Sequence, residues 1–412
     1  MLNRSLAALL SSVLLGALFI GTPAQVNASI RTWYISQVDT SGGSSSCTNP
    51  DFLADGTDEQ EAFISAFMTV GDGDTIHVCA GTYDFTAVAN YHPVAGTVVY
   101  ITGDTAANTI LDGNSITSFF DFEDTNVHIS NLTFTNGKNT LNEFGGAISA
   151  WGGNSSILFI DHSIFANNEA NCSGGAIFSE GTVWVEWSTF SNNAIAIPYC
   201  WGDGGAIGIG DEVEADLHIW DSNFESNTAS DVGGAIYFCG TNGVVDILRS
   251  EFVGNTADHE GGAVSAYNCG DLASELTVTD STFRENSSAY WGGALSSGMD
   301  DSILSFNEFS SNSSRNGGAL DLFGDESIEL SRNTFRSNSA SFMGGAISTR
   351  MLIGPGDVSR TNTFQSNRAR RGKNVGLYAP PWGNTTFVEM RKNIREWTRA
   401  RVRDVVAVSS GY

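Results

Sequence analysis

Along most of the chain, apolar residues alternate with polar ones, which is the period of two that β-strands show. In residues 275–283, for example, Leu276 and Val278 alternate with Thr277 and Thr279. No repeat shows the apolar spacing of an amphipathic helix, so helical solenoids of similar period are excluded. The pattern therefore predicts a chain of short strands.

Two motifs recur along this pattern. The tetrapeptide Gly-Gly-Ala-aliphatic occurs eight times at spacings of 25 to 31 residues, and a Phe-x-x-Asn precedes every copy but the first. The tetrapeptides begin at Gly145, Gly174, Gly204, Gly233, Gly261, Gly292, Gly317 and Gly344. The Phe and Asn pairs are Phe165 and Asn168, Phe190 and Asn193, Phe224 and Asn227, Phe252 and Asn255, Phe283 and Asn286, Phe309 and Asn312, Phe335 and Asn338, and Phe364 and Asn367 before a decayed ninth copy at Gly372. Such a fixed period predicts a stacked array.

A coil of this length holds about three strands and their turns. Stacked coils whose strands pair about 4.8 Å apart predict an all-β fold, a single-stranded right-handed parallel β-helix. Within it, Asn is expected to take left-handed backbone angles at a corner and to stack its amide on the next coil, while Phe fills the interior. The Gly pair permits a tight bend and a close backbone approach. Because these residues recur in every coil, we expect structural rather than catalytic roles for them.

The constant order of the two motifs resembles the repeats of the chlamydial-type polymorphic outer membrane proteins, from about Phe134 to Gly372. Upstream, the segments 73–83 and 110–114 resemble the opening coils of pectate-lyase-like β-helix proteins. The resemblance implies an extracellular or surface β-helix. It also implies adhesion, with the repeat tetrapeptides contributing to binding.

The chain divides into four predicted segments. Residues 1–28 have Arg4, an apolar run and a small-residue site at Ala28, which predicts a secretory signal; a membrane anchor, the alternative, needs a longer apolar stretch. Residues 29–74 form a cap region with a short helix from Asp58 to Thr69. Residues 75–375 form the coils. Residues 376–412 form a basic tail or cap, partly helical in pattern over 390–408, and no segment after the signal is apolar enough to cross a bilayer as a helix.

Six cysteines fit an oxidising compartment. Their places in adjacent coils or in the opening region suggest three disulfides: Cys47 with Cys79, Cys172 with Cys200, and Cys239 with Cys269. A zinc site is the alternative, disfavoured because no paired Cys-x-x-Cys occurs.

The formal charge of −26 is unevenly spread. Residues 349–412 carry 12 of the 20 Lys and Arg and only 4 of the 46 Asp and Glu, so this segment is +8 and the rest of the chain is −34. An acidic body of this kind repels nucleic acid and anionic polymers. No cofactor is predicted, although Ca²⁺ is the one that the charge leaves open.

Strand alternation also predicts which side chains face outward after each tetrapeptide. If the aliphatic residue points inward, the next residue and the one two further on point outward. These positions hold an interrupted stripe of aromatic residues that we expect to bind sugar rings or protein partners: Trp151, Phe178, Tyr237, Tyr267 and Phe323. A loop that covers the stripe, or the opposite strand parity, would remove it.

Candidate catalytic residues are sparse. Elimination at an acidic sugar needs a base, yet the coils through residue 348 contain a single lysine, Lys138, and five arginines. Hydrolysis needs two carboxylates that face one bond, and the candidates look like turn acids: Asp300 with Asp301, Asp211 with Glu212, and Asp221. The six histidines lack ligand spacing.

The leading hypothesis is a secreted or cell-surface β-helix protein that acts by binding a glycan or a surface protein, adhesin-like or envelope-associated and noncatalytic. An outer-membrane association is expected in a Gram-negative cell. The alternative is an extracellular polysaccharide lyase or glycoside hydrolase, and a purely structural role in an envelope layer also stays open.

Overall fold

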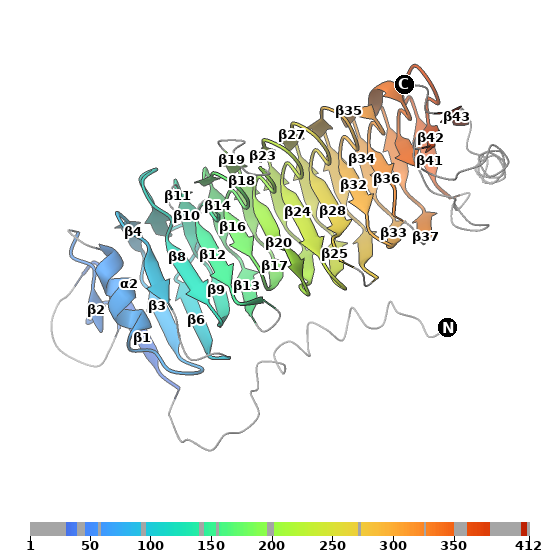
Figure 1. The fold of residues 1–412 in the computed structure, drawn as a ribbon. Helices are drawn as coiled ribbons and strands as arrows, with labels where there is room; N and C mark the ends of the chain where they lie inside the picture. Colours follow the sequence, from blue (N-terminus) through green and yellow to red (C-terminus); the bar gives the residue numbers. More distant parts are fainter. Residues whose placement is uncertain are drawn as a thin grey trace.

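The computed structural model describes residues 30–38, 46–56, 59–91, 96–139, 144–153, 156–195, 202–270, 273–324, 327–349, 361–379 and 405–409. They form a long rod of stacked parallel strands, the β-helix that the repeats predict (Figure 1). The predicted signal, residues 1–28, lies outside the described residues.

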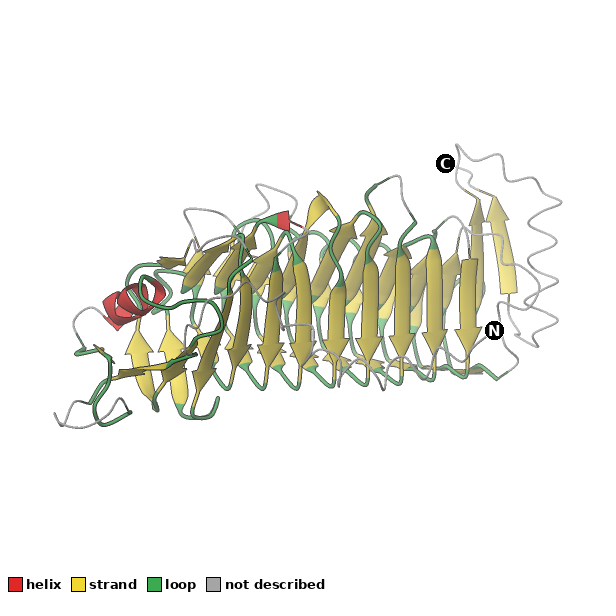
Figure 2. Ribbon diagram, turned by 90° about the horizontal axis from the view of Figure 1, so that it is seen from below, coloured by secondary structure: helices red, strands yellow, loops and turns green. Residues whose placement is uncertain are grey.

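Each complete coil contributes a strand to each of four parallel sheets, numbered 1 to 4 here in the order in which the chain visits them. The prediction of three strands per coil was wrong by one short strand. The additional sheet, sheet 3, consists mostly of two-residue strands between the Asn corner and the Gly pair, too short to show an alternating pattern. Figure 2 shows the rows of parallel strands that result.

Sheet 1 consists, in spatial order, of β2 (Phe52–Leu53), β1 (Thr32–Ser36), β3 (Thr75–Val78), β6 (Val98–Gly103), β9 (Asn126–Ser130), β13 (Ile157–Asp161), β17 (Thr182–Glu186), β21 (Leu217–Trp220), β25 (Val244–Leu248), β29 (Glu275–Thr279), β33 (Asp301–Ser305) and β37 (Ser327–Ser331). Sheet 2 consists of β4 (Gly81–Asp84), β7 (Thr109–Asp112), β10 (Thr133–Thr135), β14 (Ile164–Ala166), β18 (Thr189–Ser191), β22 (Asn223–Glu225), β26 (Glu251–Val253), β30 (Thr282–Arg284), β34 (Glu308–Ser310), β38 (Thr334–Arg336) and β41 (Thr363–Gln365).

Sheet 3 consists of β11 (Lys138–Asn139), β15 (Glu169–Ala170), β19 (Ala194–Ile195), β23 (Thr228–Ala229), β27 (Thr256–Ala257), β31 (Ser287–Ser288), β35 (Ser313–Asn316) and β39 (Ser339–Met343). Sheet 4 consists of β5 (Ala89–Tyr91), β8 (Phe120–Glu123), β12 (Ile148–Trp151), β16 (Ile177–Ser179), β20 (Ile207–Val213), β24 (Ile236–Gly240), β28 (Val264–Asn268), β32 (Leu295–Gly298), β36 (Leu320–Leu322), β40 (Ile347–Thr349), β42 (Val375–Ala379) and β43 (Val405–Ser409).

The repeated phenylalanines form a column of parallel rings inside the rod. Phe190 and Phe224 stack with their ring centroids 4.8 Å apart and an interplanar angle of 4°, and the column runs from Phe134 to Phe364. The spacing equals that of neighbouring strands, because Phe occupies the same register position in each coil. Beside the column, the aliphatic residue of each tetrapeptide is fully buried.

The repeated asparagines form a buried ladder at the corner between sheets 2 and 3. Asn227 Nδ2 donates to the Phe190 carbonyl at 3.0 Å and to Asn255 Oδ1 at 2.9 Å, and its backbone N–H donates to Asn255 Oδ1 at 3.0 Å. The amide stacking was predicted correctly, but the left-handed angles were placed one residue too late. The residue before the Asn turns the chain, as Ser226 does with φ 56°, because the Asn itself must aim its amide along the axis.

The Gly pair makes the turn into sheet 4. The first glycine takes a left-handed angle, as Gly233 does with φ 66°, and Gly372 takes the same turn with φ 57° in the decayed copy. The second glycine lies against the next coil: a Cβ on Gly234 would meet the Gly262 carbonyl oxygen at 2.1 Å. The two glycines therefore serve different needs, a left-handed turn and a close backbone approach.

The N-terminal end of the rod is covered by α2 (Glu59–Phe67), within the predicted helix 58–69. The ring centroids of its Phe63 and Phe67 lie 5.7 Å and 5.4 Å from that of Phe120.

At the C-terminal end of the rod, Val405–Ser409 is a strand that pairs with β42, so the helical pattern predicted for 390–408 was wrong over its last residues. The β-branched valines in residues 405–409 favour a strand. Residues 390–404 lie outside the described residues. No described helix has the length and apolar character needed to span a membrane.

Candidate functional site

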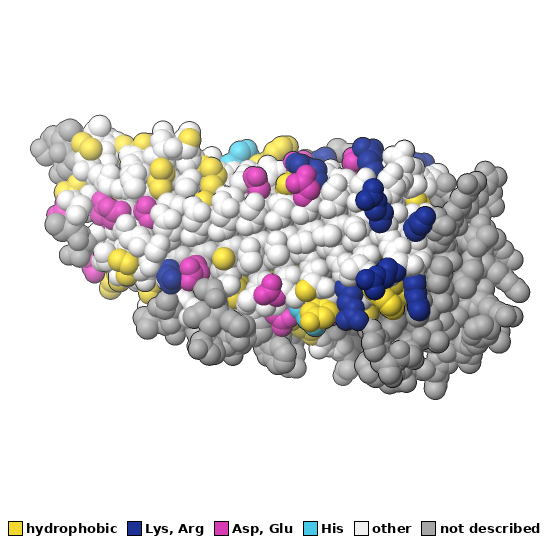
Figure 3. Space-filling view, turned by 90° about the horizontal axis from the view of Figure 1, so that it is seen from above, with side chains coloured by type: hydrophobic (Ala, Val, Ile, Leu, Met, Phe, Trp, Pro, Cys, Tyr) yellow, Lys and Arg dark blue, Asp and Glu magenta, His cyan; other side chains and the backbone are white. Residues whose placement is uncertain are grey.

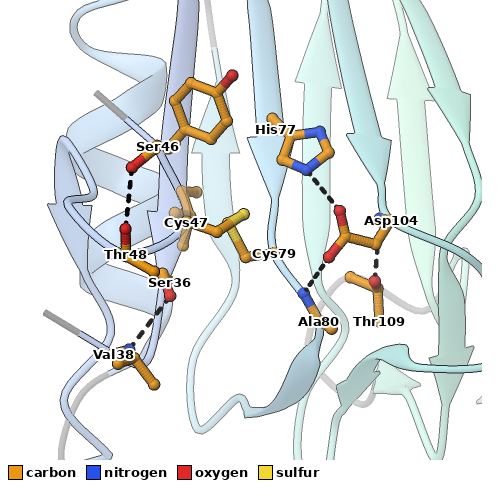
Figure 4. Close-up of a disulfide and its surroundings, with 12 residues drawn as sticks. Ser36, Val38, Ser46, Cys47, Thr48, His77, Cys79, Ala80, Asp104 and Thr109 are labelled. Carbon is orange, nitrogen blue, oxygen red and sulfur yellow. Dashed lines mark hydrogen bonds and ion pairs between the residues drawn. A yellow bond between two sulfur atoms is a disulfide. The ribbon is translucent and has the colours of Figure 1, made fainter. Parts of the chain in front are cut away.

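Two of the three predicted disulfides join described residues. Cys47 bonds to Cys79, where the loop after β1 meets the end of β3 (Figure 4), and Cys239 bonds to Cys269 beside sheet 4. Cys172 is also disulfide-bonded, and its predicted partner Cys200 lies outside the described residues.

The zinc alternative has one geometric counterpart in the described part of the chain. The ligand atoms of Cys47, His77 and Cys79 lie within 4.8 Å of one another. However, the two sulfurs bond to each other, and His77 Nε2 lies 2.8 Å from Asp104 Oδ1. Because thiolates rather than disulfides bind metals, this arrangement is a cross-link and not a metal centre.

The outer face of sheet 4 has the predicted parity, with the aliphatic residues inside. Its first outward position is nevertheless covered in most coils: Phe178 is only 5% exposed and Ser296 is fully buried. The cover comes from the residues just before each Gly pair, which form their own bridges from coil to coil, as Phe144, Ser173 and Asp203 do. We call these residues the flanking column. The expectation that Phe178 is exposed was therefore wrong.

The predicted aromatic residues form two clusters on this face. In the first, Phe178 packs against Trp151 and against Phe144 of the flanking column, with ring centroids 5.0 Å and 4.6 Å apart. The Trp151 indole N–H donates to Asp121 Oδ1 at 2.8 Å, which fixes the plane of the ring.

In the second cluster, Tyr267 lies between Tyr237 and Phe323, at centroid distances of 6.2 Å and 5.7 Å. The Tyr267 hydroxyl donates to Glu260 Oε2 at 2.8 Å, and the Ser296 hydroxyl donates to the same oxygen at 3.2 Å. Burial, and next the charge of Glu260, raise the pKa of Tyr267 well above its usual value. A ring in each cluster is thus held in place by a hydrogen bond to a partly buried acid.

A cavity of about 220 Å³, which we call the aromatic cup, lies between the two clusters. It opens where the stripe is interrupted, on the middle of the three successive strands that carry Phe178, Gly208 and Tyr237 in register. Ser173 covers Gly208, and Gly210 lines the cup without a side chain. The described residues that line the cup are Phe144, Trp151, Cys172, Ser173, Phe178, Glu180, Asp203, Ile209, Gly210 and Tyr237.

The cup combines apolar walls with three polar side chains. Glu180 is partly exposed, and Asp203 and Ser173 are each 7% exposed. The Ser173 hydroxyl has no hydrogen-bond partner, although the great majority of buried polar groups in proteins have one. None of the described residues that line the cup is basic. The arrangement can hold one small group between aromatic rings and offer it hydrogen bonds and negative charge.

Two of the acids considered for catalysis, Asp300 and Asp221, do not line the cup and have local partners. Asp300 Oδ2 accepts hydrogen bonds from the Asn268 amide and the Ser274 backbone N–H. Asp221 pairs with the Arg249 guanidinium at 2.7 Å and 2.6 Å. The side chains of Asp211 and Glu212 lie outside the described part of the structure.

Sequence reasoning missed a second aromatic row, on the outer face of sheet 1. Tyr100, His128, Phe159, Trp184 and His218 are in register on five successive strands. His128 lies between Tyr100 and Phe159, with centroid distances of 5.6 Å and 4.6 Å. The same alternation argument, applied to the strand before the Phe motif as well as to the one after the Gly pair, would have found the row.

Charge is also distributed along the rod. On the face in Figure 3, the Lys and Arg side chains gather over the C-terminal coils, whereas the Asp and Glu side chains lie nearer the N-terminal end and the middle. The aromatic cup belongs to the acidic part of the chain.

Comparison with known proteins identifies the repeats. Residues 162–180, 221–239 and 280–298 match the Chlamydia polymorphic membrane protein repeat, so the chain carries repeats of this type. The chain is 30% identical over 219 residues to the Escherichia coli (strain K12) protein "Probable autotransporter YfaL", which covers 50% of this chain. It is 33% identical over 150 residues to the Chlamydia pneumoniae "Probable outer membrane protein pmp8", which covers 33% of this chain. The chain spans 16% of the length of each relative.

Among solved structures, the PL6 family alginate lyase AlyGC aligns with 85% of this chain and 53% of its own length, at 14% identity and a TM-score of 0.40. Likeness at that level bears on neither substrate nor activity.

Proposed function

We propose that this chain, which carries polymorphic membrane protein repeats, is the β-helical part of a cell-surface or outer-membrane protein that binds a glycan or a surface protein without chemical change. The names of its relatives, an autotransporter and an outer membrane protein, support a location at the cell surface. In this proposal the rod presents sheet 4 as its binding face.

The aromatic cup is the observation that carries the proposal. Binding sites combine apolar and aromatic walls with a few placed polar groups, and the cup has this composition. Trp151 and Tyr267 are already held by hydrogen bonds to acids, so little side-chain entropy is lost on binding. Aromatic rings also provide a large contact area with a defined orientation.

The catalytic alternative has weaker support. A lyase needs a base to remove a proton, and the described lining of the cup offers carboxylates but no Lys, Arg or His. A glycoside hydrolase would need two carboxylates across one bond, and Glu180 with Asp203 is the pair that this cup would supply. The test below therefore measures cleavage together with binding.

The experiment compares the wild-type protein with Trp151→Ala and Tyr237→Ala on a polysaccharide panel, a glycan array and host-type cells. The matched control is Trp187→Ala, because Trp187 is 56% exposed and lies away from sheet 4. Loss of a central aromatic contact costs about 2 kcal/mol or more, so we expect roughly 30-fold weaker binding for the two face variants. The control should bind as tightly as the wild type. Circular dichroism checks that all variants stay folded.

Binding that survives both face variants would remove sheet 4 as the binding face. Release of unsaturated or reducing ends by the wild-type protein would instead establish an enzyme. If that release disappears in Glu180→Gln and Asp203→Asn, the hydrolase assignment of this pair would replace the proposal.

A further inference from the structure

We infer that the aromatic cup selects a positively charged organic group, an alkylammonium such as the trimethylammonium of choline, as the part of the ligand that enters it. This rests on the proposed function, because it names the chemistry of the same binding face. Three independent features of the cup carry it: its width, its charge and an unsatisfied hydroxyl.

The width follows from the strand register. Phe178 and Tyr237 are two strands apart, with Gly208 between them, so their backbone positions are separated by two strand spacings, about 10 Å. Ser173 covers Gly208, so a compact group can sit beside Gly210, between Phe178 and Tyr237. A cation within about 6 Å of a ring centroid is attracted by the ring quadrupole, and aromatic cages of this kind recognise quaternary ammonium groups.

The cup stays open because of the residue at position 210. Gly210 has no left-handed angle that would demand glycine, and a Cβ placed on it would lie 3.2 Å from Phe178 Cζ, so a larger side chain would fill the cup. Gly298 is the equivalent residue three coils later, and there Phe323 Cε2 already lies 2.6 Å from the Cβ position. The neighbouring ring thus lies closer to the outward glycine at Gly298 than it does at Gly210 in the cup.

The acidic side chains of the cup favour a positively charged occupant. Glu180 and Asp203 contribute two carboxylates to a site with apolar walls and no basic residue in its described lining. An anionic group would add like charge where water is partly excluded, which is costly, whereas a cation gains Coulomb energy from both acids. The strongly acidic body of the chain steers the same choice at longer range.

The Ser173 hydroxyl indicates that the ligand also carries a polar atom. This hydroxyl is buried, has no partner, and lies over Gly208, where a Cβ would come within 2.1 Å of its oxygen. A buried hydroxyl without a partner is unfavourable. Rotation of the Ser173 side chain toward the cup, which it lines, would let a ligand hydroxyl two carbons from the nitrogen supply the missing hydrogen bond. Choline has both groups and fits a cavity of about 220 Å³.

The test measures binding of choline and of 3,3-dimethylbutan-1-ol, which has the same shape without the charge, by calorimetry and by ligand-observed NMR. We expect choline to bind at least tenfold more tightly than the neutral alcohol, and high salt to reduce this preference. Glu180→Gln should weaken choline binding about tenfold and leave the alcohol unchanged. Gly210→Leu should abolish binding of both, while Trp187→Ala binds both as the wild type does.

Equal affinity for the two probes, or choline binding that persists in Gly210→Leu, would overturn the inference. The outcome also separates it from the proposed function. If choline does not bind but glycan or cell binding is lost in Trp151→Ala, the charge selection is wrong and the binding face stands. If neither choline nor any glycan or cell surface responds to Trp151→Ala, both fail.

Discussion

The Asn corner and the outer face of sheet 4 belong to the same coils but use buried polar groups in opposite ways. At the corner, fully buried Asn227 has its amide nitrogen, amide oxygen and backbone N–H all hydrogen-bonded to neighbouring coils. On the face, the fully buried hydroxyl of Ser348 has no partner, and neither has that of Ser173 in the cup. A residue that repeats in every coil is used by the coils above and below it. On and beside the face the residues vary from coil to coil, and Ser173 and Ser348 are left without such partners.

The largest effect on stability is expected when the Asn ladder at the corner is disrupted. Asn227→Ala removes the acceptor of the buried Asn193 N–H and the donor to the Phe190 carbonyl. Net hydrogen bonds contribute about 1 kcal/mol each and an unsatisfied buried group costs about 1–3 kcal/mol, so we expect a loss of roughly 3–5 kcal/mol in the free energy of unfolding, measured in urea. Asn223→Ala, an exposed Asn in the same coil, is the control and should change little. Similar losses for the two would show that the ladder is not what holds the corner.

The second largest effect on stability is expected from removing the disulfide beside sheet 4. Removing both Cys239 and Cys269, which are 30 residues apart, should cost about 2–4 kcal/mol, because the unfolded chain regains the freedom that the disulfide restrains. Wild-type protein measured with a reductant is the comparison. A double Cys→Ala variant as stable as the oxidised wild type would mean that strand pairing alone holds β24 and β28 together.

The face should tolerate a change that the corner does not. Ser348→Ala removes a buried hydroxyl that makes no hydrogen bond, so the free energy of unfolding should stay unchanged or rise by up to about 1 kcal/mol. Both Ser348 and Asn227 are 0% exposed. Comparing the two variants therefore separates the effect of hydrogen bonding on stability from the effect of burial. A loss of more than about 1 kcal/mol in Ser348→Ala would contradict the contrast drawn above.

The same contrast explains what sequence reasoning could reach. The Phe, Asn and Gly columns were predictable because each repeats at a fixed place, and the parity after the Gly pair placed Trp151 and Tyr237 on the outer face of sheet 4. The cup itself was not predictable. Ser173 and Asp203 enter it from the flanking column, whose position over sheet 4 depends on bridges between coils. Whether Gly210 leaves a cavity depends on which neighbouring side chains fill the space, and no alternation pattern records that.

The smallest effect concerns the aromatic row on sheet 1, a face where a histidine is packed between rings. Burial lowers the pKa of His128, and the nearby charge of Asp161 only partly opposes this. In the unfolded chain the imidazole takes up a proton near its usual pKa of about 6.5, while in the folded chain it does so only at lower pH. The stability that His128 contributes is therefore present above about pH 6.5 and is lost as the pH falls through its lowered pKa. Urea midpoints of the wild type and of His128→Phe, measured from about pH 7.5 down to about pH 5, should diverge toward acid, with the wild type losing more. Because the carboxylates are common to both proteins, parallel pH profiles would mean that this histidine is hydrated in the folded rod, and that the row on sheet 1 is a solvent-accessible face like the rim of the cup.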